Sequence, residues 1–279
     1  MDLNKFFYDL DELLSKGKSR EAVEFIQGAI DKAAEKDDKR ALIAMYNEAG
    51  GLLRDFSKHE QAEEYYNEAF LLIRELDARG SESYGTTLIN YGTCLADQGK
   101  FKEAESVFSE AVAVLSGLEK EDDYRMAAIY NNMSWIAQEQ GNMKDAGDYL
   151  NKALLLLKRV TGTEGEQAAS YTNLANLYWA QGAFEEAKVM LIKAIDIYKD
   201  RESLKNEGRY AAAISSLANI YFSEGEYEKC AVLCREAMKE IEKEFGQNDG
   251  WHIISDNLAE AERKLDDSDS DMTSDSAGK

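Results

Sequence analysis

The 279-residue sequence contains no proline, only three cysteines and only two histidines, and its 33 basic residues are outnumbered by 54 acidic ones. At an average usage of about 5%, a chain of this length would contain roughly fourteen prolines. Proline interrupts helices, and 44% of the residues are hydrophobic, so the composition suits long helices. It argues against an all-β or linker-rich chain.

The formal net charge of -21 is strongly acidic. Proteins that bind nucleic acid or anionic membranes need a basic surface, so we expect neither ligand here. A partner attracted by charge should carry basic residues, although acidity for solubility alone explains the composition equally well. No apolar run approaches the roughly 20 residues of a membrane span, and the N-terminus does not resemble a signal peptide. We therefore expect a cytoplasmic protein.

One segment, Ser170 to Asp200, recurs along the whole chain. It reads as two helices joined by a tight turn, and related segments begin near Asp9, Glu48, Asn90, Asn132 and Ser216. The turn residues are Gly17, Ser57, Gly99, Gly141, Gly182 and Gly225, at successive intervals of 40, 42, 42, 41 and 43 residues. This periodicity indicates an array of stacked repeats.

Small residues recur at two fixed places after each turn. The first set is Ala22, Ala62, Ala104, Ala146, Ala187 and Cys230, and the second is Ala29, Ala69, Ala111, Ala153, Ala194 and Ala237. Small residues on one side of a helix let its partner approach closely. The bulky residues between them are Ile26, Tyr66, Phe108, Leu150 and Leu191. The pattern predicts six closely packed helix hairpins.

These residues carry a family resemblance: the pattern is similar to the tetratricopeptide repeat (TPR). The usual repeat has 34 residues and often a proline near its end, whereas this chain has a spacing near 42 and Ser116 at that place. The variant resembles the long repeats of kinesin light chains and of bacterial peptide sensors. The segment NLANLYWAQGAFEEAK is especially close to the kinesin light chain style.

We expect an all-α fold, a right-handed superhelical solenoid of TPR hairpins within residues 1–265. The hairpins are predicted at residues 3–36, 43–78, 85–118, 127–160, 168–200 and 211–245. A capping helix is expected at residues 251–265, where no partner hairpin follows. Residues 266–279 are acidic and almost free of apolar side chains, which predicts a disordered tail.

Nothing in the sequence predicts an enzyme, a cofactor or a metal site. Cys94, Cys230 and Cys234 form no CxxC pair, and the last two lie at packing positions of the repeat. His59 and His252 lie far apart and belong to no metal-ligand spacing. There is no glycine-rich phosphate-binding loop.

The remaining candidate is a peptide-binding groove along the first helices of the hairpins, which line the inside of such a superhelix. The exposed stripe of each first helix has the spacing i, i+3, i+7, i+10. The candidate peptide-binding residues on these stripes are Asn47, Arg54, Asn131, Trp135, Gln138, Thr172, Asn176, Trp179, Asn219 and Phe222.

Asparagines recur on this stripe, and each side chain carries both a donor and an acceptor that match the backbone of an extended peptide. In the resembled families inner asparagines hold peptide backbones, a role that the resemblance implies here for Asn47, Asn131, Asn176 and Asn219. Trp135, Trp179 and Phe222 would add anchoring surfaces. Two alternatives stay open: that the asparagines bond neighbouring helices, and that the aromatic residues pack between repeats. A second set, expected to bond between hairpins, is Asn90, Asn132 and Asn173.

Carboxylates end three of the first helices, at Asp55, Asp97 and Glu139. They predict a preference of the N-terminal half of the groove for basic ligand residues. The chaperone-binding members of the resembled family instead clamp a C-terminal carboxylate with Lys and Arg. Only Arg54 occupies an inner position here, so that role is not expected.

The sequence therefore predicts a non-catalytic scaffold or adaptor that holds an extended peptide, or a segment of a partner protein. The alternative is a peptide-responsive regulator like the bacterial sensors. Those generally carry an extra N-terminal helical output domain. Because the first repeat begins by about Leu3, we expect such a regulator to act through a separate output protein.

Overall fold

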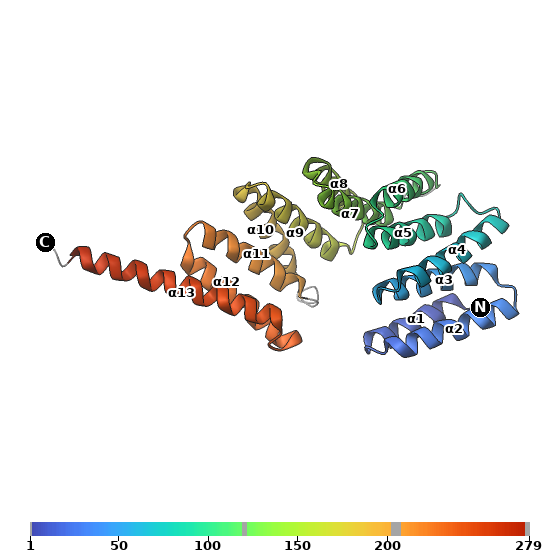
Figure 1. Ribbon diagram of the computed structural model, residues 1–279, viewed down its shortest axis with the longest axis horizontal. Coiled ribbons are helices and arrows are strands. Elements are labelled where there is room, and N and C mark those ends of the chain that lie inside the picture. The colour runs from blue at the N-terminus through green and yellow to red at the C-terminus, as the bar shows by residue number, and fades with distance from the viewer. Residues whose placement is uncertain (1, 119–121, 202–207, 277–279) are drawn as a thin grey trace. The chain divides into compact units, whose positions relative to one another are not determined.

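The computed structural model of the chain describes residues 2–118, 122–201 and 208–276 (Figure 1). Within these ranges the regular secondary structure is entirely α-helical, which confirms the all-α prediction. The backbone divides into two compact units, residues 1–140 and 141–279. The handedness of the superhelix stays a prediction.

Unit 1 is built from pairs of helices joined by short turns. Figure 1 shows α1 beside α2, α3 beside α4 and α5 beside α6, and α7 packs against α5 and α6. The helices of unit 1 are α1 (Leu3–Ser15), α2 (Ser19–Glu35), α3 (Lys39–Asp55), α4 (His59–Glu75), α5 (Glu82–Asp97), α6 (Phe101–Ser116) and α7 (Asp123–Glu139).

Unit 2 continues the same pattern. Its helices are α8 (Met143–Leu157), α9 (Glu164–Ala180), α10 (Phe184–Asp200), α11 (Arg209–Ser223), α12 (Tyr227–Phe245) and α13 (Asp249–Ser276). Helices α9 and α10 form one pair, α11 and α12 form the next, and α13 packs on α12. Thus α9 and α11 are the first helices of successive hairpins.

Several first helices begin two to four residues earlier than the repeat pattern predicts, at Lys39, Glu82, Asp123, Glu164 and Arg209. Capping side chains explain the earlier start in three of them. Asp38 Oδ1 accepts a hydrogen bond from Ala41 N at 3.2 Å, and Ser81 and Asp122 cap α5 and α7 in the same way. A side chain that satisfies a free N–H of the first turn favours a helix start at that residue.

The turn residue of each repeat has a left-handed backbone conformation. Gly182 has φ of 74° and Gly225 has φ of 78°, a region that glycine enters without a Cβ clash. Ser57 takes the same place in the second repeat with φ of 58°. The turn of the second repeat therefore has the same left-handed conformation as the others, although its residue is serine.

The predicted close packing within hairpins is confirmed. All twelve small residues at the two places after the turns are buried, with at most 4% of their surface exposed. The bulky residues between these two places are also buried and pack against the first helix of the hairpin. Gly92 of α5 shows how tight the contact is, because a Cβ there would lie 2.8 Å from Phe108 Cε1 of α6. The core of unit 1 also joins successive hairpins, because Met45 of α3 belongs to the same buried cluster as Phe6 of α1 and Ile26 of α2.

The capping helix is longer than predicted. Helix α13 runs from Asp249 to Ser276, past the expected end near Leu265, whereas the expected disorder from residue 266 onward stays a prediction. The sequence has neither proline nor glycine between Gly250 and Gly278, so no residue in this stretch interrupts the helix. The last residues of the predicted tail, 277–279, lie outside the described residues.

Among the helices that the structure describes, none is both long enough and apolar enough to cross a bilayer.

Candidate functional site

A cavity of about 140 Å³ lies between the first helices α9 and α11 of unit 2. It brings together three of the residues predicted from the sequence, Asn176, Trp179 and Asn219. Asn176 and Asn219 occupy equivalent places, six residues before Gly182 and Gly225. Stacking of the two hairpins therefore places both amides at one cavity, which we call the Asn176–Asn219 cavity.

The polar groups of this cavity are largely available. Both asparagine side chains are exposed, and Asn176 makes no hydrogen bond to any described residue. Asn219 Oδ1 accepts a long hydrogen bond of 3.4 Å from Asn257 Nδ2 of α13, and its own N–H groups are left for a ligand. Ser216 also lines the cavity, one helical turn before Asn219. Sequence reasoning missed Ser216, although its i−3 spacing from Asn219 could have indicated it, and missed Asn257 because α13 follows no repeat register.

The apolar wall of the cavity is held in place by neighbouring side chains. The Trp179 ring packs on Phe184 with centroids 4.8 Å apart, yet 38% of Trp179 remains exposed. Ala175 and Leu191 are buried beneath it. A tryptophan fixed on one side and open on the other is suited to contact an apolar side chain of a ligand.

Two further predicted residues of unit 2 are engaged within the protein. Thr172 Oγ1 donates to Ala168 O of its own helix at 3.0 Å. Phe222 is half-buried and packs on Tyr227 with centroids 5.3 Å apart. Neither residue lines the Asn176–Asn219 cavity.

In unit 1 the expectation that Asn47 faces a ligand is wrong. Its side chain is 5% exposed, and Nδ2 donates to Ile43 O and to Thr87 Oγ1, both at 2.9 Å. Oδ1 accepts from Asn90 Nδ2 at 3.3 Å. Both N–H groups and one lone pair of this buried amide are used within or between hairpins, so it has no free donor for a peptide backbone.

Two more predicted residues of unit 1, Arg54 and Gln138, contact other side chains or the backbone of the protein. Arg54 Nη2 lies 2.9 Å from Asp55 Oδ1, and Arg54 Nε lies 3.6 Å from Asp97 Oδ2. Gln138 Nε2 donates to Ser134 O at 3.3 Å. Two of the three carboxylates expected to attract basic ligands therefore already face an arginine.

Trp135 and Asn131 of α7 remain as candidates. Trp135 is 38% exposed and packs edge-on against Phe101 with centroids 6.0 Å apart. Asn131 is half-buried, and its buried Oδ1 has no hydrogen-bond donor among the described residues. Unlike Asn176 and Asn219, these two residues do not line the cavities of about 550, 420 and 330 Å³ in unit 1.

The position within the repeat explains why the four asparagines differ. Asn47 and Asn131 stand ten residues before their turns, whereas Asn176 and Asn219 stand six residues before theirs. The earlier position is packed between first helices: Asn47 is buried there, and so is the hydroxyl oxygen of Ser215. The later position is exposed in unit 2. The predicted ladder of four asparagines is therefore two different sets.

The second set of asparagines behaves as predicted in two of three cases. Asn90 donates to Asn47, and Asn132 Nδ2 of α7 donates to Thr93 Oγ1 of α5 at 3.1 Å. Both bonds join neighbouring hairpins. Asn173 is exposed and makes no such bond to a described residue.

The cysteines pack as expected. Cys94, Cys230 and Cys234 are buried and unbridged. Among the described residues there is no cluster of three or more His, Cys, Asp or Glu side chains with the geometry to hold a metal ion.

Helix pairs with buried small residues and a cavity between successive first helices define a helical-hairpin repeat protein. A tetratricopeptide repeat model matches residues 40–116 and 125–200, more than half of the sequence. The chain belongs to the tetratricopeptide repeat family. No curated protein matches the sequence.

Solved structures agree on the fold. The repeats of a putative kinesin light chain from Podospora anserina superpose with a TM-score of 0.58 at 18% identity, covering 72% of this chain and 95% of that one. The apo form of RapI gives 0.72 at 16% identity, covering 95% and 72%. A Rap protein complexed with competence and sporulation factor gives 0.65 at 12% identity, covering 94% and 75%. These identities support a likeness of fold alone.

Proposed function

We propose that this protein is a non-catalytic adaptor or scaffold of the cytoplasm that binds an extended segment of a peptide or partner protein along its first helices. One observation carries the proposal: Asn176, Asn219 and Trp179 converge on one cavity between α9 and α11. The cavity combines the free amide of Asn176 and the free N–H groups of Asn219 with an exposed aromatic ring. This combination suits a peptide, which presents backbone N–H and C=O groups together with side chains.

The spacing of the two asparagines supports an extended ligand. Packed helices lie about 8–10 Å apart, and an extended chain advances roughly 3.3 Å per residue. The two amides would therefore contact backbone groups about three residues apart. The Trp179 ring would contact a side chain between them. The net charge of -21 favours a ligand with basic residues.

A direct test starts from peptides selected for binding to the wild-type protein from a random display library. Fluorescence polarisation then gives their affinity for the double variant Asn176→Ala with Asn219→Ala, which should fall about tenfold or more. Methylation of backbone nitrogens in the peptide should weaken binding to the wild type by a similar factor. Wild-type affinity in the double variant would disprove the proposed site.

The matched control is Asn173→Ala. Asn173 lies on the same helix as Asn176 and is exposed, but it does not line the cavity. Its substitution should leave the affinity unchanged, with the same helical circular dichroism in all variants.

The second candidate is a bacterial peptide-responsive regulator that acts through a separate output protein. The likeness to a Rap protein complexed with competence and sporulation factor supports it at the level of fold. A regulator must change conformation when its peptide binds, whereas a scaffold need not. Energy transfer between dyes on exposed positions of units 1 and 2, with and without a selected peptide, separates the two. A large change favours the regulator, and no change favours the scaffold.

A further inference from the structure

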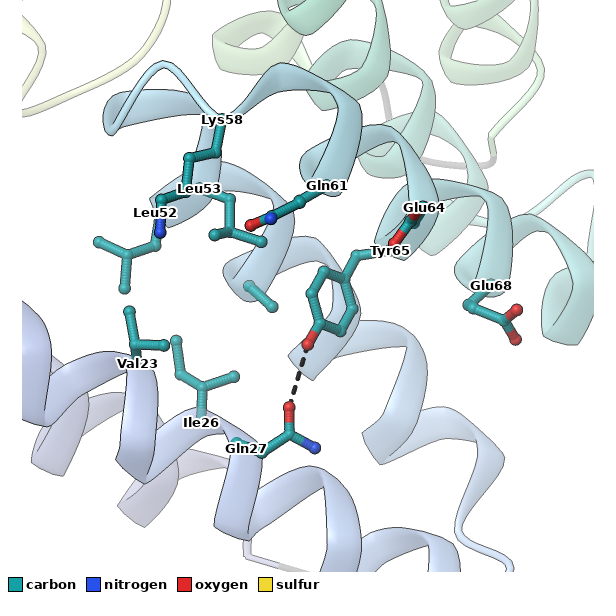
Figure 2. Close-up of a pocket in the computed structure, with 11 residues that line it drawn as sticks. Val23, Ile26, Gln27, Leu52, Leu53, Lys58, Gln61, Glu64, Tyr65 and Glu68 are labelled. Atoms are coloured by element: carbon teal, nitrogen blue, oxygen red, sulfur yellow. Dashed lines mark hydrogen bonds between the residues drawn. The ribbon is translucent and has the colours of Figure 1, made fainter.

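A larger cavity lies in unit 1, away from the first-helix stripe, between the second helices α2 and α4 with α3 behind them (Figure 2). Its volume is about 550 Å³. Cavities that bind small molecules typically measure about 300–1,000 Å³ and combine an apolar lining with a few polar groups. Both parts of that description apply here.

The inner part of this cavity is apolar. Ile26 of α2 and Leu53 of α3 are buried beneath it, and Val23 stands at the mouth with 38% of its surface exposed. Figure 2 shows Val23 and Ile26 facing Leu52 and Leu53 across the open space. An apolar body placed there would remove apolar surface from water.

One wall is an aromatic ring held by a hydrogen bond across the cavity. Tyr65 Oη of α4 donates to Gln27 Oε1 of α2 at 3.0 Å, the dashed line of Figure 2. The ring also packs on Tyr46, with centroids 5.8 Å apart. Tyr65 therefore presents a fixed ring edge and face to whatever occupies the space.

Two carboxylates lie beyond this ring, on one side of it. Glu64 and Glu68 line the cavity on α4, one turn apart, and neither forms an ion pair with a described residue. Figure 2 shows both on the far side of Tyr65 from Lys58, which stands at the opposite end near Leu52. The cavity is thus negative at the tyrosine end, positive at the other and apolar between them.

We propose that this cavity binds a small organic ammonium ion with an apolar body, such as an alkyl- or arylamine. The ammonium group lies at the tyrosine end, where Glu64 and Glu68 attract it and the Tyr65 ring offers a cation–π contact. The body lies against Ile26 and Leu53. Lys58 repels a cation at the opposite end and so sets the orientation. An anion of the same shape would lie beside two unpaired carboxylates.

Isothermal titration calorimetry of the full chain with n-octylamine, n-butylamine and n-octanoate tests both parts of this recognition. Octylammonium should bind at least about tenfold more tightly than either other probe. Octanoate binding equal to octylammonium would overturn the charge assignment. Butylammonium copies the end of a lysine side chain, and equal binding of this probe would mean that a basic peptide is the better occupant and that the proposal is wrong.

Variants locate the binding. Val23→Trp fills the mouth and should abolish octylammonium binding, whereas Val189→Trp, an exposed valine of α10 that lines no described cavity, should not. Glu64→Gln with Glu68→Gln should weaken binding roughly fivefold. The control Asp148→Asn with Glu186→Gln removes two exposed charges from unit 2 and should leave binding unchanged. Unchanged binding in the Glu64/Glu68 variant would refute the proposal even if Val23→Trp failed to fold.

Discussion

The ring of Tyr66 in α4 lies directly against the backbone of Gly50 in α3. A Cβ at residue 50 would come within 2.5 Å of Tyr66 Cε1, whereas a Cβ at the adjacent Gly51 would meet no atom within 4 Å. Tyr66 itself is fully buried. Of two neighbouring glycines in the same helix, packing within the hairpin therefore requires only Gly50 to lack a side chain.

Substituting these glycines should change stability in opposite directions. Gly50→Ala forces the Tyr66 ring to move and should lower the free energy of unfolding by about 1–3 kcal/mol. Gly51→Ala meets no neighbour and replaces a poor helix former, so it should raise that free energy by about 0.5–1 kcal/mol. Urea denaturation followed by circular dichroism measures both. Changes of the same sign would contradict the packing described here.

Replacing Ser57 with glycine should stabilise the second hairpin. Ser57 has φ of 58°, a conformation that costs a residue with a Cβ roughly 1–2 kcal/mol. Glycine avoids this cost but loses backbone entropy, so we expect a net gain of about 1 kcal/mol in the free energy of unfolding. The control is Ser109→Gly, an exposed helical serine, which should destabilise by about 0.5–1 kcal/mol. A loss of stability in Ser57→Gly would show that the serine makes a compensating contact.

Asn47 and Asn176 should respond differently to the same substitution. Asn47→Ala leaves Asn90 without an acceptor inside the hairpin interface and should cost about 1–3 kcal/mol of unfolding free energy. Asn176→Ala removes an exposed side chain with no bond to a described residue and should stay within about 0.5 kcal/mol of the wild type. Thermal or urea denaturation of the two variants side by side is sufficient. Equal costs would mean that Asn176 also has a structural role.

Glu48 should make stability depend on pH. Burial, with a smaller contribution from nearby Asp11, raises the pKa of the Glu48 carboxyl above its usual value of 4.5. Between the usual pKa and the raised pKa of this carboxyl, the native state binds more protons than the unfolded state. Glu48 therefore lowers the free energy of unfolding as pH rises through that range. Glu48→Gln should therefore be more stable than the wild type at pH 7, and its advantage should shrink as pH falls to 4.5 and below. An advantage that stays constant from pH 7 to pH 4, or one matched by the exposed control Glu186→Gln, would contradict this account.

Much of the fold could be predicted because the same pattern of small and bulky residues recurs from hairpin to hairpin. The first five repeats have an alanine five residues after the turn, as at Ala62 and Ala104, and a large residue four positions later, as at Tyr66 and Phe108. Together these residues determine how closely the two helices of a hairpin pack. Features that depend on residues outside the repeat were harder to predict. The starts of α3 and α5 follow from the caps Asp38 and Ser81, and the length of α13 follows from an absence of helix-breaking residues.

The candidate site was predicted less completely, for a geometric reason. The stripe was defined by helical spacing, which identifies a side of a helix but not which of its residues the next hairpin covers. Asn47 and Asn176 both lie on the stripe, yet stacking buries one and exposes the other. The cavity beside Tyr65 could not be predicted at all, because it depends on the separation of α2 and α4.

The hydrogen bonds of Asn47 also mean that the hairpins are not interchangeable parts. Thr87 and Asn90 of α5 supply its partners, and the residues at the equivalent places in α3 are Met45 and Glu48. A duplicated second hairpin stacked on itself would set Asn47 against a thioether and a carboxylate in place of a hydroxyl and an amide. Attempts to lengthen or shuffle this array should therefore move the second and third hairpins together, so that Asn47 keeps the helix that supplies its hydrogen-bond partners.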